Sequence, residues 1–245
     1  MSIVSGIAGL TSSEVLALIN RGGEEGTAGK TILNEHRPVC TKEYHLTGKY
    51  LDGADNPDVW FPIPGDGGGT VVYDSRFLTL TSGTGAVSAT RCVIDQEKFP
   101  ITGNFIEVTC RIGAYVAGEG GFRIVAIGFQ PAFSAYNPTD RAMFYGVDGE
   151  WYIGFAGPTN AYIKLSTLPL GRNLQTGDIC TVRLYRREGS PNIDIAGFYV
   201  NGQKQYETLN IPEQSCYAGI GVYTEVTATT ATSIAIDYFG VKYVP

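Results

Sequence analysis

The chain has 245 residues, of which 43% are hydrophobic and 17% are charged, and it is rich in Gly, Tyr and Phe. This composition excludes a disordered chain and favours short strands joined by many tight turns, while the length admits one large β domain or two small ones. The formal net charge of −6, with no basic cluster beyond Arg186-Arg187 and no long apolar run, argues against nucleic-acid binding and membrane insertion.

The first predicted element is a short helix over residues 12–20. Thr11 as N-cap and Glu14 three residues later form a capping box, and Gly22-Gly23 ends the helix. Residues 1–6 have no features of a signal peptide, so we expect synthesis in a cytoplasm without a cleaved leader. The side chains expected to mediate assembly are those of the hydrophobic staple and the apolar stripe: Leu10, Val15, Leu18 and Ile19.

A helix of this length is too short to be stable in isolation. Residues 20–48 that follow are Gly-rich and polar, with too few apolar side chains to form a core. We therefore predict that residues 1–48 form an attachment or oligomerisation segment, which packs on another copy or on another protein.

From residue 49 to 245 the sequence predicts one antiparallel β-sandwich. Strand-length apolar runs separated by turn residues repeat with the spacing of a sandwich. Asp148-Gly149 and Asn201-Gly202 are dipeptides that favour type I′ turns and so predict two hairpins. The predicted strands are 70–73, 76–81, 86–94, 104–115, 122–130, 141–147, 150–156, 161–165, 178–187, 194–200, 203–208, 217–224 and 233–243.

The sequence suggests no metal site and no cofactor. Five widely spaced cysteines without a C-x-x-C pair are interpreted as buried reduced thiols, and His36 and His45 are too few for a histidine-rich zinc centre. Asp52, Asp55 and Asp58 offer oxygen ligands, but their spacing fits no calcium loop, and we interpret them as a solvated linker.

The sandwich resembles the concanavalin A-like lectin/glucanase superfamily. The resemblance rests on residues 217–223 followed by 236–241, on 78–83, on the long strand 105–112, and on 200–202 before the penultimate strands. It implies an all-β, antiparallel jelly-roll sandwich.

A second resemblance concerns residues 9–19, which are similar to short helices in tail-fibre and other virion proteins of bacteriophages. It implies a fibre, spike or capsid decoration protein located in the virion. Such a protein would contact other virion proteins through its N-terminal segment, assemble as a homo-oligomer, with a trimer favoured, and display the sandwich for adhesion to a host-surface glycan.

The sequence offers no catalytic residues. The glucanases of this superfamily use a Glu-x-Asp-x-x-Glu strand motif, whereas Glu107 is followed by Thr109 and Ile112 at those positions, and Glu150 by Tyr152 and Phe155. We therefore expect that the protein is not an enzyme. The alternative is a carbohydrate-active enzyme of the same fold, either a glycanase or a polysaccharide lyase.

A glycan site needs an aromatic face to stack on a sugar ring, with polar groups beside it. The candidate residues share these properties in or next to strand-like runs: Trp60, Tyr145, Asp148, Trp151 and Tyr152. Aromatic residues in strands also serve as core or cross-strand packing, and this second interpretation stays open.

Overall fold

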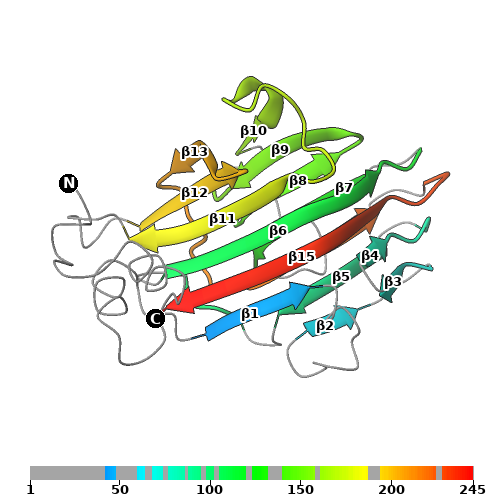
Figure 1. Ribbon diagram of the computed structural model, residues 1–245, viewed down its shortest axis with the longest axis horizontal. Helices are drawn as coiled ribbons and strands as arrows, with labels where there is room; N and C mark the ends of the chain where they lie inside the picture. Colours follow the sequence, from blue (N-terminus) through cyan, green and yellow to red (C-terminus); the bar gives the residue numbers. More distant parts are fainter. Residues whose placement is uncertain are drawn as a thin grey trace, which may run out of the picture. The chain divides into compact units, whose positions relative to one another are not determined.

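Two antiparallel β-sheets stack face to face in the computed structural model of the chain (Figure 1). The structure describes residues 42–47, 60–63, 68–73, 77–85, 88–94, 98–101, 105–119, 123–131, 140–157, 161–186, 194–224 and 228–244. Of residues 42–47, 60–63, 73, 88–89, 91–94 and 123 it describes the backbone alone. The predicted helix and the assembly residues Leu10, Val15, Leu18 and Ile19 lie outside the described residues.

The first sheet has eight strands. Their order is β13 (Gln203–Thr208), β12 (Asp194–Val200), β11 (Ile179–Arg186), β6 (Phe105–Val116), β15 (Ser233–Val244), β4 (Leu78–Thr81) and β3 (Thr70–Tyr73), and β1 (Lys42–Thr47) also pairs with β15.

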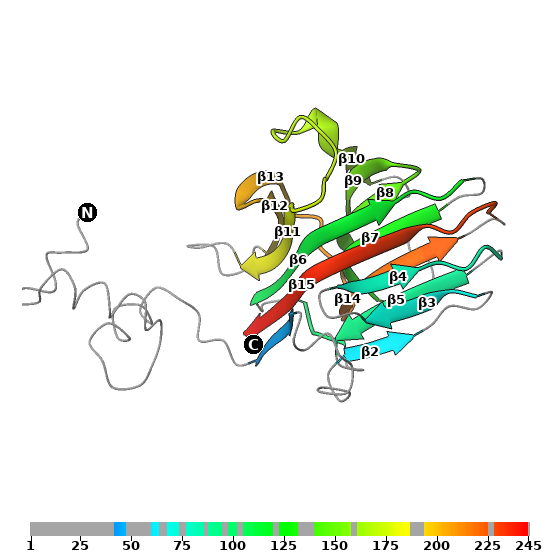
Figure 2. The ribbon, with the colours of Figure 1, turned by 45° about the vertical axis from the view of Figure 1, so that its right-hand side comes forward.

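The second sheet has seven strands, and Figure 2 shows both sheets in an oblique view. Their order is β10 (Tyr162–Lys164), β9 (Glu150–Phe155), β8 (Ala142–Val147), β7 (Arg123–Gln130), β14 (Tyr217–Thr224), β5 (Ser88–Ile94) and β2 (Trp60–Ile63). A short 3-10 helix, η2 (Leu165–Thr167), follows β10.

Both predicted hairpins form with the expected turn geometry. Asp148 and Gly149 have φ angles of 49° and 87°, and Asn201 and Gly202 have φ angles of 52° and 77°. Positive φ at both central residues is the signature of a type I′ turn, whose twist matches that of the flanking strands. The first turn fixes the register of β8 with β9, and so sets which of their side chains share a face.

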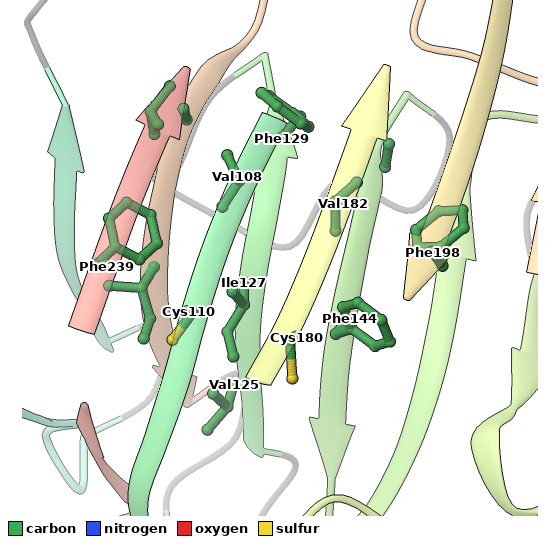
Figure 3. Close-up of a cluster of buried hydrophobic side chains, with 14 of the residues drawn as sticks. Val108, Cys110, Val125, Ile127, Phe129, Phe144, Cys180, Val182, Phe198 and Phe239 are labelled. Atoms are coloured by element: carbon green, nitrogen blue, oxygen red, sulfur yellow. The ribbon is translucent and has the colours of Figure 1, made fainter. Parts of the chain in front are cut away.

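Successive side chains of each strand point to opposite faces of its sheet, and those that point inward form the core between the two sheets (Figure 3). Val108 and Cys110 from β6 face inward toward Ile127 and Phe129 from β7, and all four are fully buried. Cys110, Cys180 and Cys216 are free and buried, as the sequence predicted for the thiols. Burial raises the pKa of each of these thiols, which keeps them protonated and unreactive.

The all-β antiparallel sandwich expected from the sequence is confirmed. Strand β1 lies before the boundary predicted at residue 48, yet it pairs with β15 along its whole length. Lys42–Thr47 therefore belong to the sandwich, and the described strands, apart from Val244 at the end of β15, fall in one compact unit that begins at Thr41. Within the described residues, no helix is long and apolar enough to cross a membrane.

Candidate functional site

The outer face of the seven-stranded sheet, turned away from the eight-stranded sheet, carries a second cluster of large side chains. Val125 and Ile127 of β7 point into the main core, whereas Ile124 and Ala126, which alternate with them along the strand, belong to this outer cluster. The outer cluster also contains Met143, Tyr145 and Tyr223, with Val147, Tyr152 and Tyr217 packed against it. A sheet face exposed only to water is usually polar, so this composition calls for a specific explanation.

Three tyrosines from β8, β9 and β10 form a tyrosine cluster on this face. The ring of Tyr145 stacks on that of Tyr152, with centroids 5.3 Å apart. Tyr162 meets both rings edge-on, at 6.2 Å from Tyr145 and 5.4 Å from Tyr152. Tyr145 is buried, Tyr152 is half-buried and Tyr162 is 44% exposed. The cluster is therefore open at the β9–β10 edge of the sheet.

Arg141 lies under the tyrosine cluster and is fully buried. Its guanidinium carbon is 5.2 Å from the Tyr145 ring centroid, within cation–π range, and its Nη2 donates to the carbonyl of Ala161 at 3.4 Å. Gly154 makes room for it, because a Cβ there would stand 2.5 Å from Nε of Arg141. The bare backbone at Gly154 thus lets the guanidinium lie beside Tyr145.

Gln130 is a second buried polar side chain on this face, at the end of β7 that pairs with β14. It stands opposite Tyr217 in the β7–β14 register and is fully buried. Its Nε2 donates to the thioether sulfur of Met143, a weak acceptor, and its Oε1 has no hydrogen-bond partner among the described residues. Lys98 places its Nζ 5.3 Å from the Tyr217 ring centroid. A shielded amide oxygen without a hydrogen-bond partner is unfavourable to a fold.

An exposed ion pair borders the tyrosine cluster. Lys164 Nζ lies 2.9 Å from Glu150 Oε2, and the Asn173 amide donates to the same oxygen at 3.4 Å. The hydrogen bond from Lys164, followed by that from Asn173, lowers the pKa of Glu150, and the same pairing raises the pKa of Lys164. Glu150 therefore stays ionised and is poorly suited to donate a proton.

An end pocket lies where β8 begins and β9 ends. It has a volume of about 540 Å³, within the range of small-molecule sites. Its polar lining includes Asp140, Asn210 and Glu213, and its apolar lining includes Ala156, Leu209 and Ile211. Among the described residues, no group of three or more His, Cys, Asp or Glu side chains could hold a metal ion.

The structure brings together only part of the predicted site. Tyr145 and Tyr152 stack on the outer face, and Asp148 is exposed in the turn that joins their strands. Trp151 points the other way: it is 1% exposed and packs edge-on against Tyr115 in the main core. It fills the core and presents no face to a ligand. Trp60 lies in β2, at the opposite edge of the sheet from β10, and its side chain is outside the described part of the chain.

Sequence reasoning missed Arg141, Gln130 and Tyr162. Period-2 alternation back from Tyr145 places Met143 and Arg141 on the same face, so the pattern itself carried the signal for Arg141. Tyr162 sits in a three-residue strand that pairs with β9, opposite Gly154, and only the sheet order brings it to Tyr145.

The fold is that of concanavalin A-like sandwich proteins. An endo-1,3-β-glucanase from Streptomyces sioyaensis has a similar structure, with a TM-score of 0.52 and 14% identity over 77% of this chain and 90% of that one. An endo-acting O-glycanase of the human gut microbiota superposes with a TM-score of 0.50 and 14% identity, over 85% of this chain and all of that one. A protein of unknown function from Shewanella oneidensis MR-1 also has a TM-score of 0.50, with 13% identity over 90% and 95% of the two chains.

No protein-family model and no curated protein matches the chain by sequence. The structural likeness corrects the expectation that the protein is not an enzyme. The glucanase and the O-glycanase share this sandwich fold with the chain at 14% identity, and two enzymes of the same fold point toward possible enzymatic activity. None of the three structures supports a virion role, which stays a prediction from the sequence.

Proposed function

We propose that this protein is a carbohydrate-active protein that binds a glycan chain on the outer face of the seven-stranded sheet and acts on it there. The observation that carries the proposal is the tyrosine cluster, which is open at the β9–β10 edge and backed by the buried Arg141. The expected glycan contact is made by Tyr152 and by Tyr162 at the edge, with the buried Tyr145 supporting both rings.

The chemistry of the cluster fits a sugar ring. An aromatic face packs against the C–H side of a pyranose, and a tyrosine hydroxyl can bond its oxygens. Glu150, Lys164 and Asn173 at the border supply a carboxylate, an ammonium and an amide, the groups that orient hydroxyls in small-molecule sites. The edge position of Tyr162 gives a long ligand a way onto the sheet.

Two substitutions and one control test this site. Replacing Tyr152 or Tyr162 by Ala removes ring area at the accessible end of the cluster, and each change is expected to weaken glycan binding about tenfold, because one aromatic stack contributes about 0.5–1.5 kcal/mol beyond its buried area. Tyr185→Ala is the matched control: Tyr185 is half-buried on the eight-stranded sheet, where its hydroxyl donates to Glu207.

The measurement is binding of the full chain to an array of neutral, amino and acidic oligosaccharides, followed by titration calorimetry with the best ligand. Incubation with the corresponding polysaccharides then tests cleavage, because hydrolysis releases reducing ends and elimination gives an unsaturated product that absorbs in the ultraviolet. If no glycan binds, or if Tyr152→Ala and Tyr162→Ala bind as tightly as Tyr185→Ala, the tyrosine cluster is not the site.

A further inference from the structure

The end pocket holds a carboxylate whose hydrogen bonds are incomplete. Oδ1 of Asp140 accepts from the backbone N–H of Glu213 at 2.8 Å, which ties the start of β8 to the loop before β14. Oδ2 of the same side chain is shielded from solvent and has no hydrogen-bond partner among the described residues. A shielded carboxylate oxygen without a donor is unfavourable to the fold, and the carboxyl group of Asp140 lies in the lining of the pocket.

The pocket adjoins the tyrosine cluster along the backbone. Asp140 directly precedes Arg141, which lies beside Tyr145. Ala156 and Gly157 follow β9, which carries Tyr152, and a Cβ at Gly157 would approach the side chains of Ala161 and Asn210. A chain bound over the tyrosines can therefore continue into this pocket.

The described lining of the pocket is acidic. The described residues around it include the carboxylates of Asp140 and Glu213 but no Lys or Arg, and its amide side chains are those of Asn210 and Gln214. Carboxylate and amide groups form hydrogen bonds with hydroxyl groups, whereas a carboxylate on the ligand would be repelled by those of Asp140 and Glu213. Leu209, 62% exposed at the pocket, offers an apolar surface for the C–H side of a ring.

We propose that the end pocket is a sugar-binding subsite for a neutral, hydroxyl-rich unit, and that Asp140 and Glu213 exclude uronic acid units from it. This inference rests on the proposed function, since it extends the glycan site at the tyrosine cluster. The role of Glu213, whose side chain is exposed at the pocket, is to accept a hydrogen bond from a sugar hydroxyl, and Asp140 places a second carboxylate beside it.

The test compares neutral glucose hexasaccharides with hexauronates on the full chain. Asp140→Asn keeps the Oδ1 acceptor for the Glu213 amide, and Glu213→Gln leaves that backbone contact in place. Glu119→Gln is the matched control, because Glu119 is exposed on a loop whose backbone bonds Thr229 and Thr230 and is not part of the pocket lining. Thermal unfolding of each variant verifies that it is folded.

Glu213→Gln is expected to bind the neutral hexasaccharide about tenfold more weakly than Glu119→Gln, the usual effect of weakening a hydrogen bond to a charged acceptor. Asp140→Asn is expected to bind the hexauronate more tightly than wild type does, because it removes one of the two carboxylates at the pocket. The hexauronate is expected to bind wild type at least tenfold more weakly than the neutral ligand. Equal binding of the two ligands by wild type, or neutral binding unchanged in Glu213→Gln, overturns the subsite. If Tyr152→Ala weakens glycan binding but the pocket variants do not, the subsite is wrong and the proposed glycan site remains. If the protein binds no glycan, both proposals are overturned.

Discussion

Gly154→Ala is the sharpest structural test of the site, because a single methyl group would displace the side chains that support the tyrosine cluster. The added Cβ would stand 2.5 Å from Arg141 Nε and 2.9 Å from Tyr145 Cε1. Both distances are well below ordinary van der Waals contact, and both neighbours are buried. Arg141 and Tyr145 must therefore move for the variant to fold.

The expected cost follows from that crowding. Overpacking a filled site costs about 1–3 kcal/mol, and removal of a glycine from a strand returns about 0.5–1 kcal/mol. The variant should thus lose about 1–2 kcal/mol of unfolding free energy. In a chain of this size, that corresponds to a fall in Tm of about 2–8 °C, measured by circular dichroism. Glycan affinity should fall as well, because Tyr145 is displaced.

A double-mutant cycle identifies the group that is displaced. In an Arg141→Met background the flexible thioether replaces the guanidinium, so Gly154→Ala should cost less than half of what it costs in wild type. The matched measurement is urea unfolding of wild type, both single variants and the double variant. The same cost in both backgrounds, or a stabilising Gly154→Ala in wild type, would refute the proposed packing of Arg141 against Gly154.

Two further outcomes are expected. Burial alone would raise the pKa of Asp178, but hydrogen bonds from Arg172, Asn201 and the Gln175 amide outweigh it and the net pKa is lowered. The stability that this carboxylate adds is therefore present above its unfolded pKa of about 4 and is lost as pH falls through the folded value. The unfolding free energy of wild type, measured in urea, should exceed that of Asp178→Asn at pH 7, and this advantage should disappear in acid. A difference between the two proteins that does not depend on pH would contradict this prediction. Deletion of residues 1–41 should leave a folded sandwich that no longer oligomerises. Light scattering on the full and the shortened chain measures the number of chains per particle. If the shortened chain forms the same oligomer as the full chain, residues 1–41 have no role in assembly.

The strands were predictable because most have a clear local signal. Turn dipeptides and apolar runs located every described strand from β3 to β15, including the two hairpins. Strand β2 was missed because Pro62 interrupts its pattern, and its edge position explains why a proline is tolerated. Strand β1 was missed because Lys42–Thr47 is mostly polar, and its pairing with β15 joins residues far apart in the sequence.

The site was only half predictable, since both faces of β8 and β9 carry large side chains. The β8 strand is buried at five successive positions, so hydrophobicity alone does not say which face holds the core. This ambiguity placed Trp151 with Tyr152 in one predicted site, although adjacent residues of a strand point to opposite faces. The distance between Trp60 and Tyr162 depends on sheet order, which local sequence does not encode.

A crystal structure of the full chain with a bound neutral hexasaccharide tests the central claim most directly. The account predicts a sugar ring packed on Tyr152 or Tyr162, with the chain directed toward Asp140 in the end pocket. A glycan bound instead on the outer face of the eight-stranded sheet, where Arg183 lies over the rings of Phe105 and Tyr199, would contradict it.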